Sequence, residues 1–243
     1  MNTETNIDDR LYFKQLLAGR DFAKTDDLAS QMVNFVYLIG DRITRETLII
    51  DPAYAVSELM EIAQQDDMKV IGALATHYHA DHVGGSMMGM NIEGAARLLQ
   101  LADVPIHIQT EEAPWIQRTT GIALDSLKLH KSGDNVSVGE IDITLLHTPG
   151  HTPGSQCFLV DQRLVAGDTL FLEGCGRTDL PGSNPEQMFE SLQLLGKLDD
   201  EVVVYPGHQY SIPKSLSMGE VRTTNYVFKP KTKDAWMQWF GGA

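Results

Sequence analysis

The chain has 243 residues, enough to bury a sizeable core, and α/β folds of this length often form one domain, so we expect a single domain over residues 1–243. Hydrophobic residues make up 42% of the chain and charged residues 21%, which excludes a disordered or fibrous protein. The net charge of −14 opposes nucleic-acid phosphates and anionic lipid surfaces, so we expect a small-molecule partner and neither a nucleic-acid nor a membrane partner.

The sequence also bears on the compartment. The segment MNTETNIDDR is polar and acidic before any apolar run begins, so we expect no secretory signal. No run approaches the roughly 18 apolar residues that span a bilayer. Cys157 and Cys175 are the two cysteines, too few for a disulfide framework. We therefore expect a cytoplasmic protein, for which a homo-oligomer is possible.

The first half of the chain predicts a βαβ-like unit followed by a second helix and strand. Apolar, β-rich runs predict the strands, and apolar residues at helical spacing predict the helices. In chain order the expected elements are the strands Val33–Ile39 and Thr47–Ile50, the helix Ala55–Gln65, the strand Val70–Ala75, the helix Ile92–Leu101 and the strand Ile106–Gln109. The stretch 111–131 shows no clear pattern.

Short strands dominate the second half. The expected strands are Ile141–Leu146, Cys157–Val160, Leu164–Ala166 and Val202–Tyr205. A helix is expected over Pro185–Leu195, because Asn184 is a suitable N-cap and proline fits the first turn. The stretch Phe228–Ala243 is compatible with a docked terminal helix and with a loose tail.

Five of the eight histidines stand beside turn residues at expected strand ends, where a sheet can hold side chains convergent. With the neighbouring aspartates, the candidates are His77, His79, His82, His151, His208, Asp81, Asp168 and, more weakly, Asp51. A lone histidine is usually a hydrogen-bonded core or surface residue, but four titratable residues within positions 77–82 favour a metal site. Imidazole and carboxylate donors without thiolates suit zinc, iron or manganese. Strand alternation would place His77 and His79 on one side, while a loop turns Asp81 and His82 inward.

The segment HYHADH at 77–82 resembles the HxHxDH signature of the metallo-β-lactamase fold superfamily. The resemblance continues, in the family's order, through TPGHTPGS at 148–155, GDTLF at 167–171 and YPGH at 205–208. It covers about residues 33–225. It implies an α/β fold of the αββα type, a sandwich of two mixed β-sheets face to face with helices on the outer faces.

The resemblance also implies two metal sites that share a bridging carboxylate. The implied ligands are His77, His79 and His151 for the first metal, Asp81, His82 and His208 for the second, and Asp168 as the bridge. Two zinc ions are the expected cofactors, with iron or manganese as alternatives. Because such a pair, about 3.5–4 Å apart, can hold a shared hydroxide and polarise a carbonyl, hydrolysis is implied, with Asp81 and Asp168 as its catalytic carboxylates.

Two branches of the family stay open. The segment GCGRTDLPG at 174–182 resembles one shared by the glyoxalase II-like thioester hydrolases and the persulfide dioxygenases. Cys175 favours the dioxygenases, whose single iron would take His79, His151 and Asp168, whereas HVGG at 82–85 and PGH at 206–208 favour the hydrolases. We expect a hydroxyacylglutathione hydrolase-like enzyme that cleaves a thioester or another ester-type small molecule. A mononuclear iron persulfide dioxygenase is the alternative, and a non-catalytic metal-binding module is a weaker one.

Arg177 and Tyr210 are candidate substrate-binding residues. Arg177 could anchor a substrate carboxylate or pair with Asp179 as plain structure, and Tyr210 stands where an aromatic rim could shape a pocket. A typical glyoxalase II carries a C-terminal helical domain that binds glutathione, but 35 residues follow His208, so we do not expect full glutathione recognition of that kind.

The segment between His82 and His151 is long and could form a lid that determines the substrate. It begins with the methionines Met87, Met88 and Met90, whose thioether side chains suit an adaptable apolar pocket or a core.

Overall fold

The structure is a computed structural model, and it describes residues 7–241. Part of the N-terminal segment used above to argue against a secretory signal, and the last two residues of the stretch 228–243, lie outside the described residues. Within the described range, no helix is long and apolar enough to cross a bilayer.

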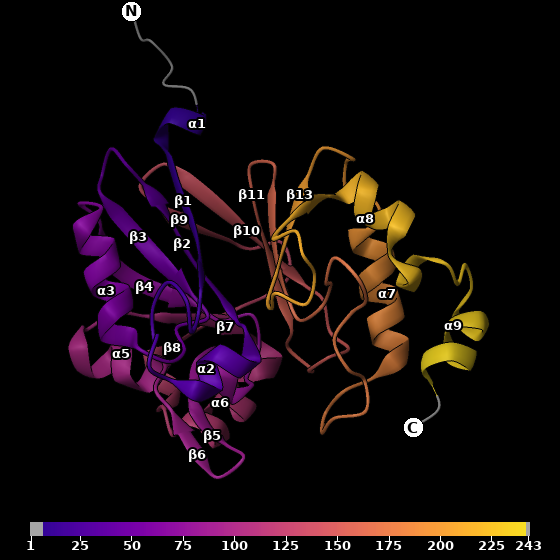
Figure 1. Cartoon of the computed structure of the whole chain (residues 1–243), viewed down its shortest axis with the longest axis horizontal. Coiled ribbons are helices and arrows are strands. Elements are labelled where there is room, and N and C mark those ends of the chain that lie inside the picture. The colour runs from indigo at the N-terminus through magenta and orange to yellow at the C-terminus, as the bar shows by residue number, and fades with distance from the viewer. Residues whose placement is uncertain (1–6, 242–243) are drawn as a thin grey trace, which may run out of the picture.

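The first sheet is mixed and six-stranded, and it is built from the N-terminal half of the chain (Figure 1). In spatial order its strands are β1 (Leu11–Leu17), β2 (Phe35–Asp41), β3 (Glu46–Ile50), β4 (Lys69–Leu74), β7 (Ile106–Gln109) and β8 (Leu127–His130). The pairs β1–β2 and β2–β3 are antiparallel, and the remaining pairs are parallel. Every residue of β2 is buried, as expected of a strand covered on both faces.

The second sheet is also mixed and six-stranded. In spatial order its strands are β14 (Leu216–Ser217), β13 (Val203–Pro206), β12 (Arg163–Gly167), β11 (Gln156–Val160), β10 (Ile141–His147) and β9 (Asn135–Val138). Within it, β12 and β13 run parallel, so both strands end at the same edge of the sheet.

Helices cover the outer face of each sheet (Figure 1). On the first sheet these are α3 (Val56–Gln65), α5 (Ala95–Leu101) and α6 (Ala113–Thr120). On the second they are α7 (Pro185–Leu195) and α8 (Met218–Thr224), and α9 (Lys233–Phe240) packs against α7. One apolar cluster fills each of the three spaces between layers. The predicted αββα sandwich is therefore confirmed.

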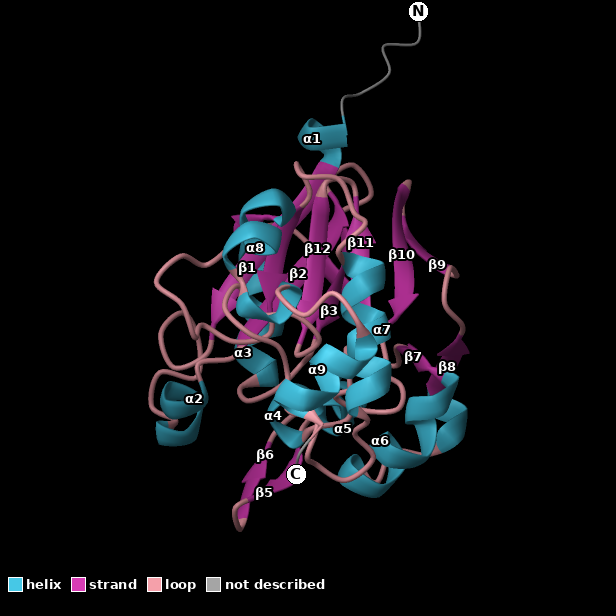
Figure 2. Ribbon diagram, turned by 90° about the vertical axis from the view of Figure 1, so that its right-hand side faces the viewer, coloured by secondary structure: helices cyan, strands magenta, loops and turns pink. Residues whose placement is uncertain are grey.

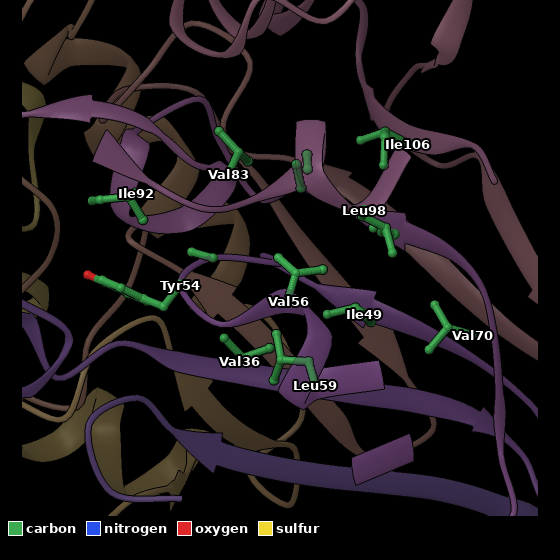
Figure 3. Packing of buried hydrophobic residues seen from close by; sticks show 14 of the residues in the cluster. Val36, Ile49, Tyr54, Val56, Leu59, Val70, Val83, Ile92, Leu98 and Ile106 are labelled. Carbon is green, nitrogen blue, oxygen red and sulfur yellow. The ribbon is translucent and has the colours of Figure 1, made fainter. Parts of the chain in front are cut away.

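Helix α3 shows how the outer layers are held. Its buried residues Val56, Leu59 and Ala63 recur at helical spacing and form one apolar stripe. Figure 3 shows Val56 and Leu59 packed close to Val36 and Ile49 of the sheet. Burying side chains of this size stabilises the fold by roughly 1.5–3 kcal/mol each.

Several local predictions differ from the structure. The first predicted strand begins at Phe35 rather than Val33, because Val33 has a left-handed φ of 50° and closes the short helix α2 (Asp27–Met32). The predicted helix at Ile92 begins at Ala95, because Ile92 pairs with Gly85 in the hairpin of β5 (Gly85–Met87) and β6 (Met90–Ile92).

Strand β1 and the preceding helix α1 (Ile7–Arg10) have no counterpart among the predicted elements. The apolar residues of β1, LYFKQLL, do not alternate with polar ones, so the periodicity that marks a half-buried strand is missing. The C-terminal stretch, open between helix and tail, forms α9, whose buried Trp236 donates its ring N–H to the carbonyl of Pro185.

Candidate metal centre

The first sheet brings four of the predicted ligands to one edge. His77 and His79 lie in the loop that follows β4, so the strand alternation expected to align them does not apply. Asp81 and His82 lie on the four-residue helix α4 (Ala80–Val83), not on a loop as predicted (Figure 2). From this turn of helix the His82 ring lies 4.2 Å from the His77 ring, between centroids, and the Asp81 carboxylate lies beside His82 and His208.

The second sheet carries the other three predicted ligands. His151 lies in the loop between β10 and β11, Asp168 directly follows β12, and His208 follows β13. The parallel ends of β12 and β13 place Asp168 Oδ2 3.4 Å from His208 Nε2. A side chain at Gly207 would not fit, because its β-carbon would lie 2.4 Å from Asp168 Oδ1.

Six of the seven predicted ligands form two groups of three, Asp168 is the seventh, and we call all seven residues the donor ring. In the first group, His79 Nδ1 lies 3.0 Å from both His77 Nε2 and His151 Nε2. In the second group, His208 Nε2 lies 3.2 Å from His82 Nε2 and 3.4 Å from Asp81 Oδ2. The atoms of each group lie within 4.8 Å of one another, close enough to share a metal ion.

Asp168 lies between the two groups. Its Oδ2 is 3.7 Å from His151 Nε2, and its Oδ1 is 3.4 Å from His82 Nε2. Within the described part of the chain, Oδ1 is buried and has no hydrogen-bond partner. Because an unpaired buried carboxylate oxygen is costly, a cation between the groups would compensate it. The donor ring therefore fits divalent metals that take nitrogen and oxygen ligands.

Burial and neighbouring charges set the protonation of the ring. Burial lowers the pKa of His79 to about 4, which leaves the neutral imidazole that binds metals. Burial would raise the pKa of Asp168, but His208 and His82 outweigh it and hold that pKa well below its usual value. Burial also lowers the pKa of His82, but Asp168 and Asp81 outweigh it and raise the pKa to about 10.

Four of the ring histidines make a hydrogen bond through Nδ1 to a group outside the ring, and this bond directs Nε2 toward the middle of the donor ring. The pairs are His77 with Thr76 Oγ1 at 3.0 Å, His82 with Asp51 Oδ2 at 2.8 Å, His151 with the Arg177 carbonyl at 2.8 Å and His208 with the Met32 carbonyl at 2.7 Å. Such outer partners fix the tautomer and orientation of metal-binding histidines.

Asp51, the weaker candidate ligand, lies behind the ring. It accepts hydrogen bonds from the backbone N–H and the hydroxyl of Thr76, both at 2.6 Å, and it pairs with His82. Its φ of 56° is unusual for a residue other than glycine. Asp51 thus ties the end of β3 to the loop after β4 and orients His82.

Two site residues, Asn34 and Tyr54, were not singled out from the sequence. The buried Asn34 side chain donates to Asp81 Oδ2 at 3.1 Å, and the Tyr54 hydroxyl donates to Asn34 Oδ1 at 2.9 Å. Figure 3 shows the Tyr54 hydroxyl extending from the apolar cluster. The one signal in the sequence that could have indicated Asn34 is its position, as a polar residue directly before the buried strand β2.

Glu112 is a third residue that the sequence did not reveal. Its carboxylate, buried to 1% exposure, accepts from the Tyr78 N–H at 2.7 Å, the Thr152 hydroxyl at 2.8 Å and the Gly154 N–H at 2.6 Å. Tyr78 stands between two ring histidines and Thr152 follows His151, so this carboxylate joins the two ligand-bearing loops. Burial raises the pKa of Glu112 to about 7.

A pocket of about 670 Å³ opens onto the donor ring, and both predicted substrate-binding residues line it. The Arg177 guanidinium makes two hydrogen bonds to Asp179, at 2.8 and 2.7 Å, which is the plain structural role left open for it. The Tyr210 ring stacks on His208 with 4.8 Å between centroids. Cys175 also lines the pocket, and burial raises the pKa of its thiol to about 12.

The chain is similar to several known proteins. Residues 31–208 match the profile of the family described as the Metallo-beta-lactamase superfamily. The chain is 30% identical over 202 residues to the "Probable polyketide biosynthesis zinc-dependent hydrolase BaeB" of Bacillus velezensis, covering 83% of this chain and 84% of that protein. It is 32% identical over 191 residues to the hydroxyacylglutathione hydrolase of Xanthomonas campestris, covering 77% of this chain and 66% of that protein.

A second kind of relative carries a different activity in its name. The mitochondrial persulfide dioxygenase ETHE1 of Homo sapiens is 30% identical over 196 residues, covering 79% of this chain and 70% of that protein. The crystal structure of ETHE1 from Myxococcus xanthus matches 95% of this chain and 90% of its own, with a TM-score of 0.77 and 28% identity. Relatives named as hydrolases and as dioxygenases thus share this fold.

Proposed function

The chain belongs to the metallo-beta-lactamase superfamily, and from that premise we propose that it is a metal-dependent hydrolase of a thioester or another ester-type small molecule. The observation that carries the proposal is that two histidines in each donor group are oriented by a hydrogen bond at Nδ1. His82 and His208, which a second metal would need, are held at Nδ1 in the same way as His77 and His151. A site for one metal would not require that arrangement.

Two zinc ions are the cofactors that we propose, with iron or manganese as alternatives. His77, His79 and His151 would hold the first ion, Asp81, His82 and His208 the second, and Asp168 both. When bound, such a pair supplies a hydroxide nucleophile at neutral pH and polarises a substrate carbonyl.

The chain's own residues contribute position and charge. Asp81 and Asp168 line the pocket, so their carboxylates would face the reacting end of a bound substrate. Asn34 holds the Asp81 carboxylate in place, and the deep burial of Asp168 limits its contact with water. Arg177 and Tyr210 would contact the part of the substrate that does not react.

Persulfide dioxygenation is the second candidate. The ETHE1 relatives and the presence of Cys175 in the pocket wall favour it, and His79, His151 and Asp168 would then hold one iron ion. His82 and His208 would have no ligand role in that case.

An activity screen separates the two candidates. We expect the purified chain to hydrolyse thioesters or lactones, and to lose that activity when a chelator removes its metal. Oxygen consumption with glutathione persulfide, without hydrolysis of any thioester or lactone, would contradict the proposal. Inactivity on all three substrate classes would favour the weaker alternative, a metal-binding module without catalysis.

The remaining expectations stay predictions. We expect a small-molecule partner, neither a nucleic-acid nor a membrane partner, and a cytoplasmic location. A homo-oligomer is possible. The −14 net charge and a pocket of small-molecule size support the first of these.

A further inference from the structure

The hairpin of β5 and β6 supplies part of the pocket wall. Its strands pair in register from Gly85 with Ile92 to Met87 with Met90, and the hairpin projects from the body of the molecule (Figure 2). Ile92 is buried in the same apolar cluster as Val83, which anchors the base of the hairpin (Figure 3). The far end of the hairpin is therefore the part that is free to contact a ligand.

The turn of this hairpin carries a residue that local structure does not favour. Met88 and Gly89 both have positive φ, 52° and 78°, as in the two-residue turns that prefer asparagine or aspartate followed by glycine. Met88 is 80% exposed, so its side chain adds little to the core. Neither the turn nor the core therefore accounts for a long apolar side chain at this position, which directs attention to the pocket beside it.

Met88 lies in the wall of the pocket that opens onto the donor ring. Met87 and Met88 both line it, whereas Met90, on the next strand of the same hairpin, does not. Other parts of the wall are apolar as well, and they include Phe171, Leu180 and Tyr226. Thioether and aromatic side chains together form an adaptable apolar surface that accepts chains of different shape.

The charges of the pocket argue against a strongly anionic substrate. Among the described residues that line it, Arg177 is the single lysine or arginine, and Asp179 already engages its guanidinium. Glu173 adds a negative charge to the same wall. Away from the donor ring, a carrier group with several carboxylates would therefore lose water contacts without gaining a free lysine or arginine as partner.

We propose that the substrate carries an extended apolar acyl chain, which lies against Met87 and Met88 while its thioester carbonyl faces the donor ring. This inference rests on the proposed function, because it assigns a substrate class to the same site. Each methylene that leaves water for the pocket should raise kcat/KM by about fourfold, which corresponds to ~0.8 kcal/mol per methylene. The rise ends where the chain outgrows the pocket.

The test is the dependence of kcat/KM on chain length. We would assay N-acetylcysteamine thioesters from acetyl through butyryl and hexanoyl to octanoyl, with the natural chain and with the double variant Met87→Ser, Met88→Ser. The natural chain should prefer octanoyl to acetyl by at least about a hundredfold, given six added methylenes that are only partly buried. The double variant should lose most of that preference.

Met90→Ser is the matched control, since Met90 lies on the same hairpin outside the pocket. It should keep the preference of the natural chain. A flat profile in the natural chain, an unchanged profile in the double variant, or an equal loss in Met90→Ser would overturn the inference. So would a higher kcat/KM for S-lactoylglutathione than for the octanoyl thioester.

A binding measurement separates this inference from the proposed function. S-ethyl and S-octyl N-acetylcysteamine thioethers cannot be hydrolysed, and calorimetry gives their affinities directly. Tight binding of the octyl compound alone, without hydrolysis of any thioester, would support the pocket assignment and reject the hydrolase. Hydrolysis at equal rates for all chains, with equal binding of both thioethers, would support the hydrolase and reject the pocket assignment.

Discussion

The donor ring and the rim of the pocket, by which we mean Met88 and Tyr210, face the same cavity but differ in how far their side chains are buried. Ring residues are mostly buried; His82 is hydrogen-bonded to Asp51, and Asp81 accepts a hydrogen bond from Asn34. At the rim, Met88 is 80% and Tyr210 56% exposed. Metal ligands need fixed geometry, whereas an apolar wall needs only an adaptable surface. Substitutions should therefore cost activity at the ring and change selectivity at the rim.

The largest effect is expected for Asp168→Ala. This change removes the carboxylate that lies between both donor groups, so both metal ions should be lost together with activity. The fall in kcat/KM should exceed the roughly 10- to 100-fold cost of losing an outer partner. Metal analysis and thioester assays check it, with the exposed Asp125→Ala as a control that should behave like the natural chain. Retained metal and activity in Asp168→Ala would show that the assignment is wrong.

His208→Ala should come next, because it damages one group and spares the other. We expect the variant to keep one metal equivalent through His77, His79 and His151 and to lose the other. Its hydrolytic activity should fall with the loss of the second metal. A variant with the metal content of the natural chain would mean that His208 is not a ligand, as in a mononuclear iron enzyme.

Glu112→Gln tests a residue that supports the ring without belonging to it. In Glu112 the two carboxylate oxygens each accept a hydrogen bond, one from the Tyr78 N–H and the other from the Gly154 N–H. Glutamine replaces one of these oxygens by an NH₂ group, which cannot accept, so one bond is lost and the loops of Tyr78 and Gly154 should move apart. We expect metal affinity to fall by about 10- to 100-fold, measured by competition with a chelator. The neighbouring, exposed Glu111→Gln is the control and should match the natural chain. Equal metal affinities in Glu112→Gln and Glu111→Gln would show that Glu112 does not support the donor ring.

The smallest effect is expected at the rim residue Tyr210. Tyr210→Phe keeps the ring that stacks on His208 and should change KM by less than about twofold. Tyr210→Ala removes the stack, and KM should rise by about two- to tenfold while kcat changes less. A collapse of kcat in Tyr210→Phe would instead mean that the hydroxyl takes part in the reaction.

The ring could be predicted from sequence because its members lie in short motifs beside strand ends. HYHADH, the His151 segment, Asp168 and His208 each follow or join predicted strands, and the sandwich brings those ends to one edge. The prediction of the local structure of the motif was wrong, because Asp81 and His82 lie on helix α4 and not on the expected loop. One turn of helix carries too little periodicity to be seen in four residues.

Glu112, Asn34 and β1 could not be predicted for a different reason. Glu112 makes its bonds to backbone N–H groups far away in sequence, and such donors leave no mark on residue types. Asn34 is defined by its contact with Asp81, 47 positions later. β1 is an edge strand whose pattern does not alternate, so its pairing with β2 emerges only in the folded chain.

The metal content of the purified, active chain tests the central claim most directly. The two-metal account predicts two divalent equivalents per chain, zinc above all, and thioester hydrolysis that rises with metal occupancy. One iron equivalent per chain, with oxygen consumption on glutathione persulfide, would contradict it.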